Sequence, residues 1–141
     1  MSPRPTPPPA DLVASDAARA LAEDVGSGDV TAALLPDAAD IAYLLCKEEA
    51  VVAGRPWFDA CHRALDPEVR IDWRVQDGDR VPAGTVLATL SGRTRALVTA
   101  ERAALNFLQT LSGTATTTAA YVDAVQGTGC TILDTRKTLP G

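Results

Sequence analysis

Five consecutive residues near the end of this 141-residue sequence, Asp134, Thr135, Arg136, Lys137 and Thr138, include two cations and two hydroxyls of the kind that hold small anions. An arginine offers a planar fork that matches a carboxylate or a phosphate, and an adjacent lysine adds a compact charge. The five residues follow a short apolar run, so they would project from the carboxyl edge of a strand. The residues alone leave two interpretations open: an anion-binding site, or a solvated loop held by a salt bridge.

Arg102 is a second candidate for anion binding. Asn106 stands four residues after it, so the two side chains share one face of a predicted helix and could reach a ligand together. We expect Thr99 to be the N-cap of this helix and Glu101 to lie in its first turn, near the positive end of the helix dipole. The ordinary alternative is a solvated surface arginine.

Other kinds of catalytic chemistry have little support in the sequence. Cys46, Cys61 and Cys130 are far apart, and no CxxC pair or histidine cluster accompanies them, which disfavours a disulfide framework or a zinc site. We expect all three to be buried, reduced thiols. His62, the only histidine, lies in a short amphipathic stretch and is expected to have a structural or surface role.

The charge distribution favours a small anionic ligand over nucleic acid. The net charge is −5, yet residues 91–141 carry more basic than acidic side chains. No dense basic face is visible, so nucleic acid is not an expected partner. No apolar run approaches the roughly 18 residues that a membrane span needs, and the N-terminus does not resemble a secretory signal. The sequence therefore predicts a cytoplasmic protein without a membrane partner.

The elements that must position these residues follow from hydrophobic periodicity. Val69, Ile71, Trp73 and Val75 alternate with charged residues, which is typical of a half-buried strand. Apolar residues after position 97 recur every three or four residues, which indicates a long helix. Gly113 interrupts this helix, so we expect a kink, a break or a close backbone approach there. The predicted helices are 11–25, 56–65 and 97–125, and the predicted strands are 41–46, 51–53, 69–75, 85–90 and 130–134.

A glycine-punctuated loop with three acidic residues covers positions 23–31. It could touch a ligand or a partner subunit. We favour the local interpretation, a helix C-cap followed by a turn that Asp29 caps.

Several of these segments, taken in order, resemble one enzyme family. Residues 23–31, 75–86, 99–113 and 127–141 are similar to motifs of quinolinate phosphoribosyltransferase, also called nicotinate-nucleotide pyrophosphorylase (carboxylating). The resemblance covers residues 12–141. One departure is Leu139, because the family commonly has a second threonine there and leucine offers no hydroxyl.

The resemblance implies an α+β fold, with an α/β-hammerhead-like N-terminal domain, a small antiparallel sheet, and then an open α/β barrel. We expect a disordered proline-rich tail at 1–10, the N-terminal domain at 11–113, and the first helix and strand of a truncated barrel at 114–141. Residues after about 113 should be poorly supported unless another chain packs on them, because a lone parallel strand cannot form a sheet. The fragment alone is expected to be inactive.

The resemblance also implies a reaction of NAD biosynthesis. The quinolinate nitrogen attacks the anomeric carbon of phosphoribosyl pyrophosphate, pyrophosphate and carbon dioxide leave, and nicotinate mononucleotide remains. Magnesium would assist the pyrophosphate, although this sequence shows no ligands for it.

The family motifs assign roles to individual residues. Arg102 would bind quinolinate in the partner's site of a homodimer, whereas Arg136 and Lys137 would be cations of the chain's own site, with Lys137 as the catalytic residue. Thr135 would offer an amide or a hydroxyl. Supporting roles would fall to Glu101, Asn106 and Thr138.

Three alternatives remain open at this point. A related phosphoribosyltransferase that acts on nicotinate would share the motifs. The hairpin at 77–87 is similar to that of biotinyl or lipoyl carrier domains, but the only lysines, Lys47 and Lys137, do not lie in the tight turn that such domains modify. A binding or vestigial role is the third.

Overall fold

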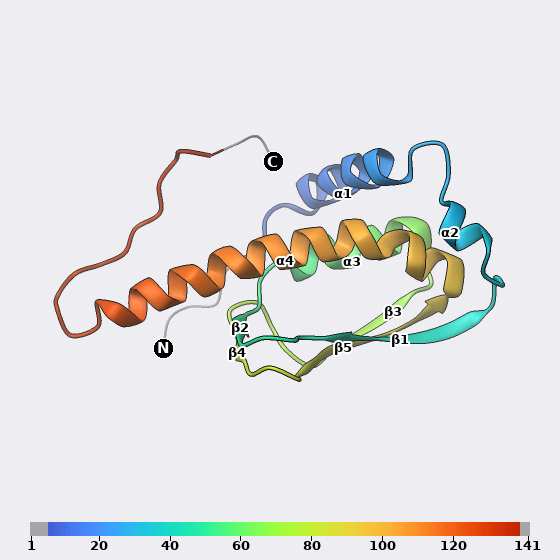
Figure 1. Ribbon diagram of the computed structural model, residues 1–141. Helices are drawn as coiled ribbons and strands as arrows, with labels where there is room; N and C mark the ends of the chain where they lie inside the picture. The colour runs from blue at the N-terminus through green and yellow to red at the C-terminus, as the bar shows by residue number, and fades with distance from the viewer. Residues whose placement is uncertain (1–5, 139–141) are drawn as a thin grey trace.

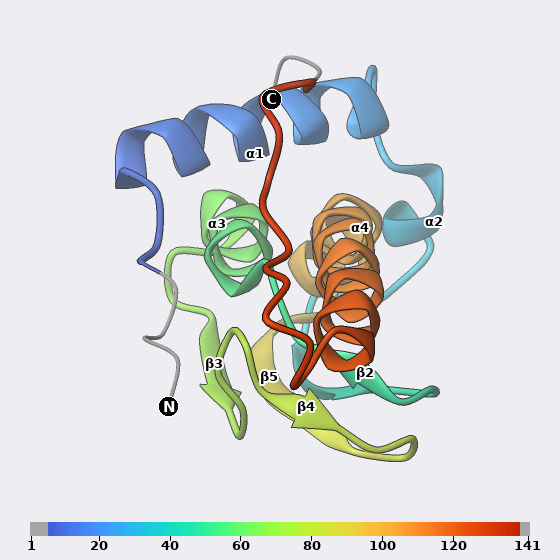
Figure 2. The same cartoon turned by 90° about the vertical axis from the view of Figure 1, so that its left-hand side faces the viewer.

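The computed structural model describes residues 6–138 as helices on one side of a small antiparallel sheet. Figure 2 shows three tiers, with α1 above the pair α3 and α4, and these two above the sheet. The helices are α1 (Ala10–Val25), α2 (Val30–Ala33), α3 (Arg55–Leu65) and α4 (Thr94–Ala124). The strands are β1 (Ala39–Leu45), β2 (Ala50–Val51), β3 (Arg70–Trp73), β4 (Arg80–Val81) and β5 (Val86–Arg93). The predicted α+β class with a small antiparallel sheet is confirmed.

The sheet has the order β1-β5-β3, and β2 pairs separately with β4; all the pairings are antiparallel. Alternation decides which side chains face the helices. Ile71 and Trp73 are partly buried against the core, whereas Arg70 and Asp72 are exposed on the opposite face. The pattern expected at 69–75 is therefore confirmed.

The core lies between α3, α4 and the inner face of the sheet. Phe58 is 2% exposed, and its ring contacts Trp73 edge-on at 5.3 Å. Gly54 begins α3 with a φ of 109°, and a Cβ there would lie 3.0 Å from a methyl carbon of Leu111, so this glycine permits α3 to approach α4 closely. Other buried members of the core are Ala17, Leu21, Val52, Cys61, Val69, Val81, Leu87, Ala88, Leu90, Leu97, Ala103, Ala104 and Leu108.

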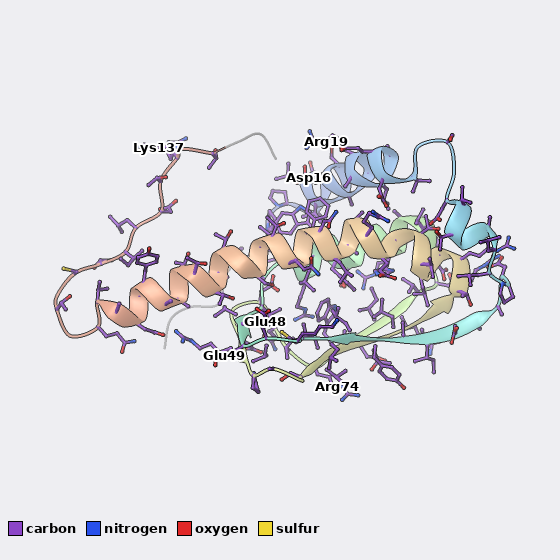
Figure 3. The ribbon with its side chains drawn as sticks, viewed as in Figure 1. Asp16, Arg19, Glu48, Glu49, Arg74 and Lys137 are labelled. Carbon is purple, nitrogen blue, oxygen red and sulfur yellow. The ribbon has the colours of Figure 1, made fainter. Side chains whose placement is uncertain are left out.

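Helix α1 is anchored by a buried carboxylate. Asp16 is 5% exposed and accepts hydrogen bonds from the Trp57 indole at 3.1 Å and from Arg19 at 2.6 Å. These two donors lower the pKa of Asp16. Because Trp57 belongs to α3, this contact fixes α1 to the second tier. Figure 3 labels Asp16 and Arg19 on α1.

Two hydroxyls attach α4 to the edge of β2. Ser112 accepts a hydrogen bond from the Ala53 amide at 3.0 Å, and Thr116 accepts one from the Val51 amide at 2.9 Å. Helix α4 runs through Gly113 without a break, and nothing lies within 4 Å of a Cβ built there. The expected break or close backbone approach at Gly113 was therefore wrong, because the helix is continuous there and the glycine faces open space between these two anchors, whereas the kink stays a prediction.

Several other local predictions need correction. Helix α4 begins at Thr94, directly after β5, so Thr99 is not its N-cap and Glu101 is not in its first turn. The amide and the hydroxyl of Thr94 both donate to the Ala38 carbonyl, which fixes the earlier start. Leu65, the last residue of the helix predicted at 56–65, is 39% exposed.

The strand predicted at 130–134 does not form. These residues lie in an extended segment that turns back from the end of α4 (Figure 1). A strand needs a neighbouring strand for its backbone groups, and none lies beside this segment within residues 6–138. Cys130 is exposed on it, contrary to the expected burial, and Leu133 is 77% exposed. Poor support was expected after about residue 113, and the exposure of 126–138 fits it, but residues 114–124 continue α4 and are bonded to the body through Thr116 and Asp123.

Of the proline-rich tail expected at 1–10, residues 1–5 lie outside the described part, as does the departure at Leu139. Residues 6–9 form no helix or strand, and α1 begins at Ala10. The division of the chain at 113 stays a prediction.

Candidate substrate-binding site

Arg102 lies on the surface of α4 beside the end of α1. Its side chain is 76% exposed, and its Nε lies 3.2 Å from a carboxylate oxygen of Asp24. Asp24 belongs to the last turn of α1, and its side chain is only 28% exposed. Packing of α1 against α4 therefore places an acidic partner beside the predicted anion-binding arginine.

A groove of about 600 Å³ surrounds this arginine, between α4 and the segment that joins α1 to α2. Glu101 and Asn106 line it together with Arg102, so the predicted common face exists even though the helix starts earlier than expected. The other lining residues are Asp24, Val25, Gly28, Asp29, Val30, Thr31, Val98, Thr99, Leu105 and Gln109.

Asp29 organises the loop side of the groove. Its carboxylate accepts a hydrogen bond from the Ala32 amide at 2.9 Å, which makes it the N-cap of α2 and confirms the local capping predicted for it. The Ala32 amide, the Thr99 hydroxyl and, more weakly, the charge of Arg102 lower the pKa of Asp29. The loop predicted at 23–31 thus ends in a short helix, and it contacts α4.

The second group of predicted site residues lies elsewhere. Thr135, Arg136, Lys137 and Thr138 are all exposed on the extended C-terminal segment. None of the four lines the groove at Arg102, and Figure 3 shows Lys137 on this segment, apart from the helices. Within one copy of the described chain, the two groups of cations are therefore not brought together.

Another groove, of about 670 Å³, lies where α3 ends and α4 begins, and it contains none of the predicted site residues. Its buried carboxylate, Asp66, accepts hydrogen bonds from the amides of Glu68 and Arg93. The Arg93 side chain is paired with Asp37. Asp66 and the Arg93 side chain thus have partners within the chain, which indicates a structural role for them.

Cys61 and His62, two side chains of types used in nucleophilic or acid–base catalysis, are buried in the core. Burial lowers the pKa of His62 to about 4 and raises the pKa of Cys61 to about 11, so both are neutral near pH 7. His62 is 4% exposed and has the structural role that was one of its two predicted roles. Among residues 6–138, no group of three or more histidine, cysteine or acidic side chains could hold a metal ion.

The sequence alone did not identify Asp24 and Thr99 as contacts of the site. Asp24 belongs to the acidic loop at 23–31, which was interpreted as a helix C-cap followed by a turn. Thr99 was interpreted as the N-cap of the long helix. Helical spacing gave one usable signal, because Thr99, Arg102 and Asn106 follow one another at intervals of three and four residues and line the same groove. Over the same described residues, no helix is long and apolar enough to cross a membrane.

The chain matches the family model described as "Quinolinate phosphoribosyl transferase, N-terminal domain" over residues 29–112. It is 44% identical over 125 residues to a chloroplastic nicotinate-nucleotide pyrophosphorylase (carboxylating) of Arabidopsis thaliana. It is 42% identical over 125 residues to quinolinate phosphoribosyltransferase (decarboxylating) 1b of Nicotiana tabacum. Each match covers 86% of this chain and 35% of the relative, so the chain spans about a third of the length of these relatives.

Solved structures agree with this relationship. The nicotinate-nucleotide pyrophosphorylase of Francisella tularensis superposes with a TM-score of 0.92 at 36% identity, over 99% of this chain and 51% of that one. NadC of Streptococcus pyogenes superposes with a TM-score of 0.90 at 37% identity, over 96% of this chain and 49% of the other. The carrier-domain interpretation is correspondingly disfavoured. The chain belongs to the quinolinate phosphoribosyltransferase family and contains its N-terminal domain.

Proposed function

We propose that this chain is the N-terminal part of a carboxylating nicotinate-nucleotide pyrophosphorylase, in which its groove at Arg102 binds quinolinate. The observation that carries the proposal is the exposed Arg102 guanidinium beside an open groove, in a domain of this family. Quinolinate has two carboxylates, and an arginine fork can hold one of them through two parallel charge-assisted hydrogen bonds. A relative that acts on nicotinate would need to hold only one carboxylate.

The proposed reaction forms two bonds and breaks two. The pyridine nitrogen of quinolinate bonds to the anomeric carbon of phosphoribosyl pyrophosphate, and the bond from that carbon to the pyrophosphate oxygen breaks with its electron pair on oxygen. The 2-carboxylate then leaves as carbon dioxide, and a proton replaces it on the ring. Positive charge must stand where the pyrophosphate develops negative charge.

The proposed site draws residues from two subunits of a homodimer. Arg102 of one subunit would reach the site that contains Arg136 and Lys137 of the other, with Lys137 as the catalytic cation and Thr135 as a donor. The separation of Arg102 from these residues within one chain supports this arrangement. Glu101, Asn106 and Thr138 would have supporting roles.

The described residues do not fit a resident magnesium ion, because they contain no suitable group of ligands. A magnesium ion that assists pyrophosphate would be held mainly by the substrate's own oxygens. The cytoplasmic location remains a proposal, since one plant relative is described as chloroplastic and another, from Nicotiana glauca, as mitochondrial.

The role of Arg102 can be tested in a full-length protein that contains this sequence. Loss of a charge-assisted bidentate contact should raise the KM for quinolinate by about 10- to 100-fold in Arg102→Ala. Arg63→Ala is the matched control, because Arg63 is an exposed helical arginine paired with Asp59, away from the groove. Unchanged KM and turnover in Arg102→Ala would refute the proposed role.

Sharing of the site between subunits needs a separate experiment. Arg102→Ala and Lys137→Ala proteins are assayed alone and after being refolded together. In a symmetric dimer with shared sites, random mixing should restore about a quarter of the wild-type activity, because half of the dimers then contain one intact site. If both residues serve the same subunit's site, mixing will restore nothing.

A further inference from the structure

The contact between Asp24 and Arg102 joins a short side chain on the last turn of α1 to a long, exposed side chain on α4. Arg102 is 76% exposed and has a long side chain that can adopt many rotamers. Asp24 is 28% exposed and has a short side chain at the end of α1. The ion pair therefore restricts the arginine more than it restricts the aspartate.

Helix α1 gives Asp24 a fixed backbone position. Val13, Ala17 and Leu21 are buried on its inner face, and Asp16 is held by the Trp57 indole. At the end of the helix, the Gly26 amide donates to the Ala22 carbonyl at 3.2 Å, which closes the last turn around Asp24. The carboxylate is thus presented from a packed element and not from a free loop.

The contact leaves part of the guanidinium available. The closest approach joins Asp24 Oδ1 to Arg102 Nε, whereas a carboxylate ligand can be held by the two terminal Nη groups. Among residues 6–138, Arg102 makes no other ion pair within 4.0 Å. An incoming carboxylate could therefore bind the end of the fork while Asp24 remains at its base.

Another acid of the groove, Asp29, is already engaged. Asp29 accepts hydrogen bonds from the Ala32 amide and the Thr99 hydroxyl, which orient its carboxylate within the cap of α2. It adds negative charge near Arg102 but serves the loop. Asp24 is the acid that contacts the guanidinium directly.

We propose that Asp24 is a positioning residue for Arg102, holding the guanidinium at Nε so that its terminal nitrogens face a dicarboxylate ligand. This inference rests on the proposed role of Arg102 in binding quinolinate. Preorganising a flexible side chain reduces the entropy lost on binding. Loss of Asp24 should therefore weaken binding of the dicarboxylate and leave the chemical step unaltered.

The test uses Asp24→Asn in the full-length protein, since asparagine keeps the shape and removes the charge. We expect the KM for quinolinate to rise about 3- to 10-fold, with kcat and the KM for phosphoribosyl pyrophosphate unchanged. Glu23→Gln is the matched control, because it removes the adjacent exposed acid, which does not line the groove. That variant should behave as wild type.

A double variant separates positioning from a structural role. If Asp24 acts only through Arg102, the double variant Asp24→Asn/Arg102→Ala should have the same KM for quinolinate as Arg102→Ala alone. A structural role would instead add to the Arg102→Ala effect and lower the melting temperature of Asp24→Asn.

The outcomes distinguish this inference from the proposed function. A defect in Arg102→Ala together with an unchanged or lowered quinolinate KM in Asp24→Asn overturns the positioning role alone. An absence of any defect in Arg102→Ala overturns the proposed function and the positioning role together.

Discussion

Arg102 and Lys137 carry the same charge in two regions of opposite physical character. Arg102 projects from a part of α4 whose other faces are packed, since Ala103, Ala104 and Leu108 beside it are buried. Lys137 lies on an extended segment in which every described residue from 126 to 138 is exposed. The first region can hold a side chain in place from within this chain, and the second cannot.

The transition between the two regions falls within one helix. The buried residues of α4 end at Leu108, and the helix continues to Ala124. Tyr121 is 63% exposed, and the last turns project beyond the sheet in Figure 1. A helix can continue beyond its packed region because its backbone hydrogen bonds lie within the helix. A strand cannot, because its backbone groups need a neighbouring strand. This difference explains why 113–124 is helical and 130–134 is not a strand.

The largest expected effect concerns apolar side chains in the two regions. Leu108→Ala removes a core side chain that is 5% exposed, and it should lower the free energy of unfolding by about 2–5 kcal/mol. The same change in the second region, Leu133→Ala, should alter it by less than about 0.5 kcal/mol. Urea denaturation of both variants measures the difference, and similar losses would contradict the division into two regions.

The next effect is a pH dependence confined to the packed region. Because burial lowers the pKa of His62 to about 4 from an ordinary value near 6.5, the unfolded chain binds the proton more readily between these values. Stability from this group is present above about pH 6.5 and is lost as pH falls toward 4, by up to about 3 kcal/mol. His62→Gln should flatten this slope between pH 4.5 and 7 in denaturant titrations. An equal slope in both proteins would show that His62 is not the group responsible.

The smallest effect concerns the contact that ties the end of α4 to the body. Arg80 of β4 makes two hydrogen bonds of 2.7 Å to Asp123. Both side chains are about half exposed, so Arg80→Ala should leave global stability almost unchanged. It should speed amide hydrogen exchange in the last turn of α4, and 1 M salt should do the same to the wild type.

The control for this measurement is Arg74→Ala. Arg74 is also exposed, and within residues 6–138 it forms no ion pair with α4. Faster exchange in both variants would mean that the Arg80–Asp123 pair does not hold the helix end.

Periodicity by itself determined the main elements of this protein. The alternation from Val69 to Val75 predicted β3 and its buried face, and apolar spacing predicted most of α4. The ordered motifs identified the family. These features are local, so each can be read from a short stretch of the chain.

Only the tertiary structure decided which distant residues meet. Asp24 reaches Arg102, Asp16 holds Trp57, and Thr99 serves Asp29 instead of capping α4. Such pairs depend on how helices pack, and no sequence period encodes that. The segment at 130–134 had the apolar pattern of a strand, but a strand exists only where a neighbour accepts its hydrogen bonds, and that is a property of the assembled fold.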